Sequence, residues 1–352
     1  MKIAIMGGWN TDSGASLHSE LIGRSFVNMG HDLTVFTFYE HAFHGTQITG
    51  ENEPYVTRCF THSRFNPVQL NPIPFITQDY ELFIAEDIGM LPKDDLKKIY
   101  DTYIKKRAKT INVIHDNALS DDPSFYQFEW DAIVCFDERY KPFLKEVNPE
   151  SKIRVIPYPC LPWNKGDKYK AREKLDLPKD KKIILTFGPN SNRLLDVINE
   201  IDCLNDEYPV LLLVLSKDPV IINTYKKLKK KMKSKVVIRE ESPSIHRLYR
   251  YLHASDILLY YRQLTPHIVV ASTIMQCLGA GCPIVANVSR FTETFNNEIF
   301  KFNNQKELLS GIKHIFDETD VYNQVMASAK DYVTRCSQDA VAKKFIELYK
   351  TL

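Results

Sequence analysis

Two short segments of the sequence carry glycines and hydroxyl groups in positions suited to holding a phosphate or a sugar. The first spans residues 7–14, which read GGWNTDSG and follow an apolar strand candidate at residues 2–6. Gly7, Gly8 and Gly14 let backbone N–H groups approach a ligand closely. A tight strand-to-helix turn without a ligand is the alternative. The glycines do not form Gly-x-Gly-x-x-Gly, which is evidence against a classical NAD enzyme.

The second segment, residues 274–286, reads IMQCLGAGCPIVA. It predicts a helix ending in small residues that let helix and sheet approach closely, then a turn and a buried strand. Gly281 can take a positive φ at the helix stop, and Pro283 cannot continue a helix. Ser272 and Thr273 would open this helix at the carboxyl edge of a parallel sheet, where a helix N-terminus favours phosphate. Simple N-capping is the alternative for both hydroxyl groups, and the two roles are compatible.

A histidine and an aspartate, His115 and Asp116, end the strand candidate at residues 111–114. Sites concentrate at the carboxyl ends of strands in parallel α/β sheets, so His115 is a candidate for contact with a substrate. A hydrogen-bonded structural histidine is the alternative. Asp116 is placed to orient His115 or to cap the next segment.

The elements that must position these residues alternate between strand and helix, which is typical of parallel sheets with crossover helices. Residues 40–78 carry weaker patterns and are expected to form an irregular excursion. The expected strands are 2–6, 33–38, 82–85, 111–114, 132–135, 153–156, 182–187, 209–215, 235–238, 256–260 and 283–286, and the expected helices are 15–28, 192–203, 218–232, 245–253, 305–317, 320–333 and 337–351.

A proline-rich segment at residues 157–162 separates the two halves and is the best linker candidate. The length of 352 residues also favours two domains. We therefore expect an α/β protein with two Rossmann-like, doubly wound parallel-sheet domains that face a cleft, and domain interfaces are favoured ligand sites.

Composition excludes several classes of protein. Hydrophobic residues make up 44% and charged residues 26% of the chain, which indicates a globular protein. The formal net charge of +2 gives no case for nucleic-acid binding. The seven cysteines are scattered without zinc spacing, as expected in a reducing compartment. The sequence shows no signal-peptide pattern and no membrane-spanning run, so a cytoplasmic location is expected.

In the order of its motifs the chain resembles a GT-B glycosyltransferase, most similar to glycosyltransferase family 4. The resemblance covers nearly the whole chain and is weakest over residues 40–78. Besides the glycine loop and the segment at 274–286, the matching segments are GHDLTV at 30–35, VIHD at 113–116, DAIVC at 131–135, IRVIP at 153–157, REKL at 172–175, IILTFG at 183–188 and LYRYLHASDI at 248–257.

The chain also departs from the family pattern. Pro189 replaces the arginine that usually follows the glycine after the strand at 182–187, and Arg193 is the only nearby cation. The family has two glutamates seven residues apart at the donor helix. Here the second position is Gln276, and the first falls within residues 266–269, which contain no carboxylate.

The resemblance implies a set of site residues. His115 would contact the transferred sugar, and Arg193 would stabilise the charge that builds on the leaving diphosphate, an effect worth about 3 kcal/mol of barrier. A surface arginine near a helix start is the alternative for Arg193, although Asn190 and the two residues after it offer a phosphate-facing loop and a helix N-cap. Gln276 could bind a ribose hydroxyl or be polar filler. The implied donor-binding residues are Gly7, Gly8, Gly188, Asn190, Ser272, Thr273 and Gln276; the implied acceptor-binding residues are Ser13, Gly14 and Asp116; no metal ligand is expected.

The resemblance also implies domain limits. The N-terminal acceptor domain would span residues 1–160, with a C-terminal helix at 337–352 packing back on it, and the C-terminal donor domain would span residues 161–336.

The implied activity is that of a retaining, metal-independent hexosyltransferase that needs no cofactor. It would move a sugar from a nucleotide-diphosphate sugar to a sugar, lipid-linked or small-molecule acceptor. Two alternatives stay open: a GT-B-like protein that binds a nucleotide or partner without transfer, and a nucleotide-sugar epimerase. Lysine-rich stretches at 97–107 and 226–231 are either solvated helix faces or a peripheral contact with the inner face of a membrane. The sequence does not identify the donor sugar, the base, the acceptor or the oligomeric state.

Overall fold

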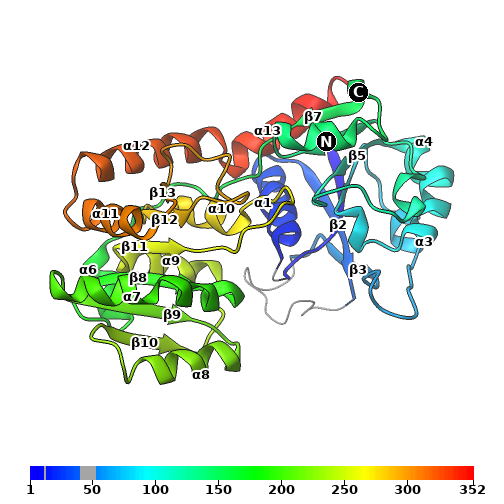
Figure 1. Cartoon of the computed structure of the whole chain (residues 1–352). Helices are drawn as coiled ribbons and strands as arrows, with labels where there is room; N and C mark the ends of the chain where they lie inside the picture. The colour runs from blue at the N-terminus through cyan, green and yellow to red at the C-terminus, as the bar shows by residue number, and fades with distance from the viewer. Residues whose placement is uncertain (12, 40–52) are drawn as a thin grey trace. The chain divides into compact units, whose positions relative to one another are not determined.

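The computed structural model describes residues 1–11, 13–39 and 53–352, with the backbone alone for residues 189 and 190. The chain forms two compact units (Figure 1). Unit 1 contains Met1–Pro159 and Cys336–Leu352, and unit 2 contains Cys160–Arg335.

Unit 1 is built on a seven-stranded sheet in which all paired strands run parallel. Its order is β3-β2-β1-β4-β5-β6-β7, so the chain order reverses direction between β1 and β4. In open α/β sheets ligands bind outside the carboxyl ends of the strands at such a switch point. The strands are β1 (Lys2–Met6), β2 (Asp32–Phe38), β3 (Val56–Phe60), β4 (Leu82–Glu86), β5 (Lys109–Val113), β6 (Ala132–Cys135) and β7 (Ile153–Val155).

The last helix of the chain, α13 (Gln338–Tyr349), belongs to unit 1 and lies beside the first helix, α1 (Gly14–Asn28) (Figure 1). Ser25 on α1 donates a hydrogen bond of 2.7 Å to Asp339 on α13. The other helices are α2 (Ile73–Thr77), α3 (Lys93–Ile99), α4 (Lys105–Arg107) and α5 (Lys141–Leu144), the π-helical turn η2 (Tyr100–Ile104), and the short 3-10 segments η1 (Ile88–Met90), η3 (Pro123–Tyr126), η4 (Glu138–Tyr140) and η5 (Glu150–Lys152).

Unit 2 repeats the plan with a six-stranded parallel sheet of order β10-β9-β8-β11-β12-β13. Its switch point lies between β8 and β11. All six residues of β9 are buried, as expected for a central strand that is covered on both faces. The strands are β8 (Lys182–Phe187), β9 (Val210–Leu215), β10 (Lys235–Arg239), β11 (Ile257–Tyr260), β12 (Ile284–Asn287) and β13 (Phe300–Phe302). The helices are α6 (Lys168–Lys174), η6 (Pro189–Val197), α7 (Ile198–Cys203), η7 (Leu204–Asp206), α8 (Pro219–Leu228), α9 (Ile245–Ala254), α10 (Ser272–Leu278), α11 (Gln305–Phe316) and α12 (Asp320–Arg335).

The segment at 274–286 forms the expected helix, turn and strand, and Gly281 has the predicted positive φ of 67°. Gly279, at the end of the helix, does not allow the close approach to the sheet that was expected but a close approach to another segment of the chain. A Cβ atom at Gly279 would lie 2.3 Å from the carbonyl oxygen of Leu161 and 2.8 Å from that of Pro162. The end of helix α10 therefore packs against the last residues of the proline-rich linker, whereas the sequence predicted close packing against the sheet.

Other expectations differ from the structure in detail. Within residues 40–78, Val56–Phe60 forms the edge strand β3 and Ile73–Thr77 forms α2, while residues 40–52 lie outside the described part. The helix expected at 192–203 begins as the 3-10 segment η6 and becomes α-helical only at Ile198. The helix expected at 218–232 ends at Leu228. The strand β13 was not predicted from the sequence.

A buried carboxylate anchors the amino end of β11 in unit 2. Asp256 accepts hydrogen bonds of 2.7 Å from Arg172, from Lys168 and from the backbone N–H of Ile183. The side chains of Arg172 and Asp256 are only 3% and 8% exposed. Removing one member of a buried pair leaves a charge without compensation, which typically costs about 3–5 kcal/mol.

We therefore predict that Asp256→Ala lowers the free energy of unfolding of unit 2 by about 3 kcal/mol or more. The matched control is Asp331→Ala, which removes the partner of Arg335 in an exposed pair on α12 and should cost less than about 1 kcal/mol. Urea unfolding followed by circular dichroism measures both. Equal losses in the two variants would contradict the structural role of Asp256.

Candidate active site

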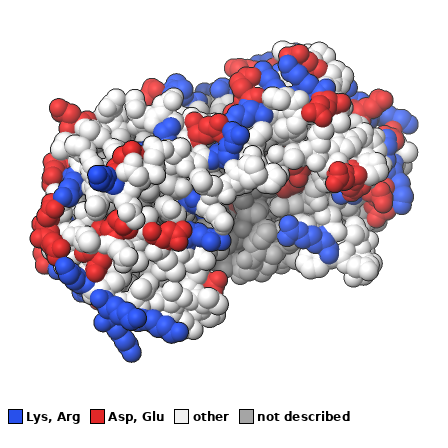
Figure 2. Space-filling model, in the orientation of Figure 1, with Lys and Arg blue, Asp and Glu red and all other residues white. Residues whose placement is uncertain are grey.

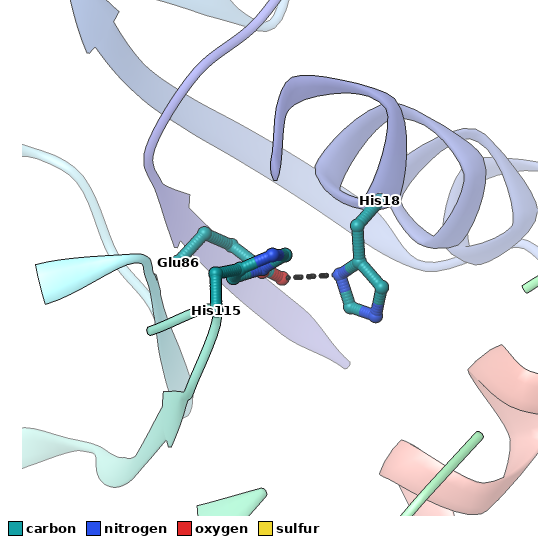
Figure 3. Close-up of side chains that lie close together, drawn as sticks. All are labelled: His18, Glu86 and His115. Carbon is teal, nitrogen blue, oxygen red and sulfur yellow. Dashed lines mark hydrogen bonds and ion pairs between the residues drawn. The ribbon is translucent and has the colours of Figure 1, made fainter. Parts of the chain in front are cut away.

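A buried carboxylate between two histidines lies at the carboxyl ends of β4 and β5 (Figure 3). Glu86, the last residue of β4, has Oε1 2.9 Å from Nδ1 of His18 on α1 and Oε2 2.9 Å from Nε2 of His115. The side chains of His18 and Glu86 have no exposed surface, and that of His115 is 11% exposed. The cluster lies beside the β1–β4 switch point, and His115 is its one accessible member.

The two histidines have opposite pKa shifts although they share one carboxylate. Burial lowers the pKa of His18 despite the nearby charge of Glu86. Burial acts in the same direction on His115, but the hydrogen bond and the charge of Glu86 outweigh it and raise its pKa. Burial acts to raise the pKa of Glu86, and the two histidines together hold it below its usual value. The arrangement is therefore a carboxylate, a neutral His18 and a His115 poised to carry a proton.

The same three residues are the one group among the described residues that could hold a metal ion, because their ligand atoms lie within 4.8 Å of one another. Two imidazoles and a carboxylate are a donor set that zinc accepts. A metal would require both facing ring nitrogens to give up their protons and both hydrogen bonds to Glu86 to break. In the structure the three residues are joined by two hydrogen bonds of 2.9 Å.

Two further carboxylates follow the strands at the same sheet edge. Asp87 has a left-handed φ of 56°, which costs a non-glycine residue roughly 1–3 kcal/mol and is typical of functional sites. A Cβ atom at Gly89 would lie 3.2 Å from Oδ1 of Asp87 and 3.4 Å from Oδ1 of Asp116. Burial, and then the charge of Asp87, raises the pKa of Asp116 to about 6. Asp116 thus changes its charge close to neutral pH and can accept a hydrogen bond from a hydroxyl group above that point.

The glycine loop after β1 has structural reasons for its glycines. A Cβ atom at Gly7 would lie 2.7 Å from Cβ of Glu86, and one at Gly8 would lie 3.1 Å from Cβ of Ser16. Ser13 caps α1 by accepting from the N–H of Ser16, and the carbonyl of Gly14 accepts from the hydroxyl of Tyr158 at 2.6 Å.

Part of the hydrogen-bonding capacity of this loop is used within the protein. The N–H of Asn10 donates to Glu20 and that of Thr11 donates to Ser16. The turn interpretation therefore holds for the loop, and contact of Gly7, Gly8, Ser13 and Gly14 with a ligand stays a prediction.

The predicted donor residues of unit 2 lie after β8 and on α10. Gly188 has a positive φ of 83° and begins η6 without a side-chain cap. The expected N-cap at Asn190 and the two residues after it is wrong, because Gly188 occupies the N-cap position and these residues lie inside η6. The hydroxyl of buried Ser191 donates to the carbonyl of Gly188. The side chain of Asn190 lies outside the described part, and Arg193 is exposed on η6.

On α10, the hydroxyl groups of Ser272 and Thr273 do not cap the helix, since Ala271 occupies the N-cap position. The N–H of Ser272 donates to the carbonyl of Val270. Gln276 is 8% exposed, and its backbone carbonyl accepts from the hydroxyl of Tyr249. The simple capping interpretation of the two hydroxyls is therefore wrong, and the hydroxyl of Thr273 instead accepts a hydrogen bond from Arg262.

An arginine that the sequence analysis did not single out lies beside Thr273. Arg262 follows the carboxyl end of β11, and its Nη2 lies 3.4 Å from Oγ1 of Thr273. Its Nε and Nη1 are buried and have no hydrogen-bond partner among the described residues. Asn287 bonds to both the N–H and the carbonyl of Arg262 at 2.8 Å, and the ring of Tyr260 lies 4.5 Å from the guanidinium carbon.

Arg262 is therefore a held cation at the switch point of unit 2, between the rings of Tyr260 and Phe291, with two buried nitrogens that lack a hydrogen-bond partner among the described residues. Together with Phe187 and Thr273 it lines one small pocket. The signal in the sequence was its position directly after an apolar strand, the same signal that identified His115.

The two lysine-rich stretches differ in their surroundings. In the first, Lys97, Lys98 and Lys105 each pair with an aspartate. In the second, the lysines of α8 and the turn after it are exposed and gather on one end of unit 2 (Figure 2). No helix within the described ranges combines the length and the apolar character needed to cross a bilayer.

Comparison with known proteins identifies the fold. No protein-family profile matches the sequence. Solved structures match over the whole chain, among them a glycosyltransferase from Rickettsia africae ESF-5, with 18% sequence identity, a TM-score of 0.69 and coverage of 99% of this chain and 98% of that chain. The Anabaena protein HepE in complex with UDP and glucose has 16% identity and a TM-score of 0.65, with 100% of each chain covered.

A third match is sucrose-phosphate synthase from Thermosynechococcus elongatus, with 14% identity, a TM-score of 0.65 and coverage of 100% of this chain and 98% of that chain. At such identities the similarity concerns the fold. It confirms the predicted class: the protein consists of two Rossmann-like parallel-sheet units with the GT-B fold.

Proposed function

We propose that this protein is a glycosyltransferase that moves a sugar from a nucleotide-diphosphate sugar to an acceptor hydroxyl. The observation that carries the proposal is Arg262, a held guanidinium with unpartnered buried donors at the switch point of a GT-B unit. Buried donors without partners are costly, and an anionic group is the partner that suits a guanidinium. Matching structures that contain UDP support a nucleoside diphosphate as that anion.

In this proposal unit 2 holds the donor. The glycosyl–phosphate bond leaves its electron pair on the diphosphate, so a fixed cation lowers the barrier by stabilising charge that grows in the transition state. Arg262 and the hydroxyl of Thr273 would contact the diphosphate. Ser272 precedes Thr273 in the chain, and Gly188 and Asn190 follow β8, the strand that pairs with β11. Arg193 would supply a second, more exposed cation. Gln276 would bind a ribose hydroxyl as a neutral acceptor, more weakly than a glutamate.

Unit 1 would hold the acceptor. His115, fixed by Glu86, would contact the sugar that is transferred, and Asp116 would accept a hydrogen bond from the attacking hydroxyl. We propose the retaining course, in which the acceptor attacks the face that the diphosphate leaves and the diphosphate takes the acceptor proton. The protein then contributes position and charge, so neither a metal nor another cofactor is required.

The direct test is release of UDP from a panel of UDP-sugars in the presence of candidate acceptors, with the anomeric configuration of any product determined by NMR. Release that depends on the acceptor supports the transferase. A changed sugar without an acceptor would identify an epimerase, and binding of UDP without turnover would identify a nucleotide-binding protein.

We predict that Arg262→Met lowers turnover by roughly 100-fold, because it removes about 3 kcal/mol of transition-state stabilisation. UDP affinity, measured by calorimetry, should fall as well. Lys306→Met on exposed α11 is the matched control and should leave both values unchanged. Arg193→Met should have a smaller effect than Arg262→Met; the reverse order would assign the diphosphate contact to Arg193.

The raised pKa of Asp116 predicts a pH dependence. Because its pKa is about 6, ionised Asp116 is lost as the pH falls through 6, and kcat/KM should fall about tenfold per pH unit below that point. Ionisation of this carboxyl also costs stability above its unfolded pKa of about 4, fully so above pH 6. Asp116→Asn should therefore raise the melting temperature at pH 8, change it little at pH 4, and remove the acidic limb of the activity profile.

The hydrogen bonds within the histidine–glutamate cluster predict that metal removal has no effect. Dialysis against EDTA should leave turnover within about twofold of its starting value. Removing a catalytic metal would instead raise the barrier by several kcal/mol and lower turnover far more. Elemental analysis of the purified protein should find far less than one zinc per chain. Activity that disappears with EDTA and returns with zinc would instead place a metal between His18, Glu86 and His115.

A further inference from the structure

A pocket of about 200 Å³ lies within unit 1, between the strands β5 and β6 and the segments that follow them. It runs from the surface into the core. Tyr126 and Val147 at its outer end are 40% and 39% exposed, whereas Trp130 and Ile133 at its inner end are 3% and 2% exposed. The pocket therefore has a solvent-facing mouth and a closed floor.

Five aromatic side chains line one part of the pocket, which also has polar lining residues. They are Phe125, Tyr126, Phe128, Trp130 and Phe143, and the rings of Phe128 and Trp130 stack at 5.3 Å. Flat aromatic surfaces favour a flat ligand, and the polar residues favour one that carries a polar group. A dry apolar cavity of about 150 Å³ is enough to bind benzene, so the volume fits one aromatic ring with a small substituent.

Two buried polar atoms belong to the lining residues at the inner end. Oδ1 of Asn112 and Nε1 of Trp130 have no hydrogen-bond partner among the described residues. Both residues are only 3% exposed, so bulk water does not replace the missing partners. One atom accepts a hydrogen bond and the other donates one. A hydroxyl group is the smallest substituent that can both donate to the amide oxygen and accept from the indole N–H.

The charges around the pocket favour a neutral ligand. Asp116 and Glu129 line it, and the ammonium group of Lys152 already donates to the carbonyl of Trp130 at 2.8 Å. An anionic ligand would therefore meet two carboxylates and a single ammonium group, a balance of charge that disfavours it relative to a neutral ligand.

We propose that this pocket binds a neutral, one-ring aromatic alcohol, with its ring against the aromatic walls and its hydroxyl group between Asn112 and Trp130. Asp116 connects the pocket to the sheet edge that carries His115, so such a ligand would bind beside the site assigned to the acceptor. The binding site itself does not rest on the proposed sugar transfer.

The experiment compares 4-fluorophenol with 4-fluorotoluene, which has nearly the same shape but no hydroxyl group. Fluorine NMR relaxation of each probe, titrated with the full chain, gives the two dissociation constants. We expect the phenol to bind about fivefold to tenfold more tightly, the value of about one net hydrogen bond. In Asn112→Leu this preference should fall to about one, because the leucine has a similar size and no acceptor. Equal binding of the two probes by the wild type would overturn the proposal.

A second pair of variants tests the pocket without changing its core. Val147→Trp adds bulk at the exposed mouth and should abolish binding of both probes, whereas Val220→Trp, at a 73% exposed position on α8, should leave binding unchanged. Binding that survives Val147→Trp would contradict the assigned location.

A separate arm tests whether the ligand is the acceptor. Wild-type protein incubated with UDP-glucose and 4-fluorophenol should be assayed for the aryl glucoside. A product that is lost in Val147→Trp supports the pocket as an acceptor site. Binding without product would support the pocket as an effector site. That result would contradict transfer of glucose to the bound alcohol, but not binding of the alcohol in the pocket.

Discussion

The geometry of unit 1 depends on the pair of hydrogen bonds that the buried carboxylate of Glu86 accepts from His18 and His115. A carboxylate without solvent contact is stable only when hydrogen-bond donors replace its water. His18 and His115 supply those donors from positions 68 residues before and 29 residues after it in the chain. The same requirement joins α1, β4 and the segment after β5, and it explains why residue 7 is a glycine, since any Cβ atom there would collide with Glu86.

Unit 2 contains a comparable carboxylate at the opposite edge of its sheet. Asp256 precedes β11, and both of its carboxylate oxygens accept hydrogen bonds, from Arg172, from Lys168 and from the backbone of Ile183. Arg262, at the carboxyl end of the same strand, has the reverse character. Its backbone is held by Asn287 while two of its nitrogens are unpartnered. The paired carboxylate thus lies at the amino end of β11, and the arginine with unpartnered nitrogens lies after its carboxyl end. Open α/β sheets bind their ligands at the carboxyl ends of the strands.

Unpartnered buried polar atoms mark both of the regions to which a ligand is assigned. The guanidinium of Arg262 calls for an anion, whereas Asn112 and Trp130, one acceptor and one donor inside aromatic walls, call for a neutral hydroxyl. This difference in charge is the reason why we propose an anionic ligand for unit 2 and a neutral ligand for unit 1.

The sequence by itself determined most of the strands and the candidate position of His115, because these follow from local apolar runs and from the rule that sites lie at strand ends. The GT-B fold class was implied by the resemblance of the ordered motifs to glycosyltransferase family 4. The sequence did not determine β3, in which three of the five residues are only partly buried and the pattern is weak, or the 3-10 start of the helix after β8. It did not reveal the hydrogen bond between Glu86 and His18. In the sequence Glu86 only ends an apolar run, and His18 is one of many positions on a predicted helix. Only the tertiary structure decided such pairings, because the contact between side chains far apart in the chain depends on how helices rotate and pack against the sheet.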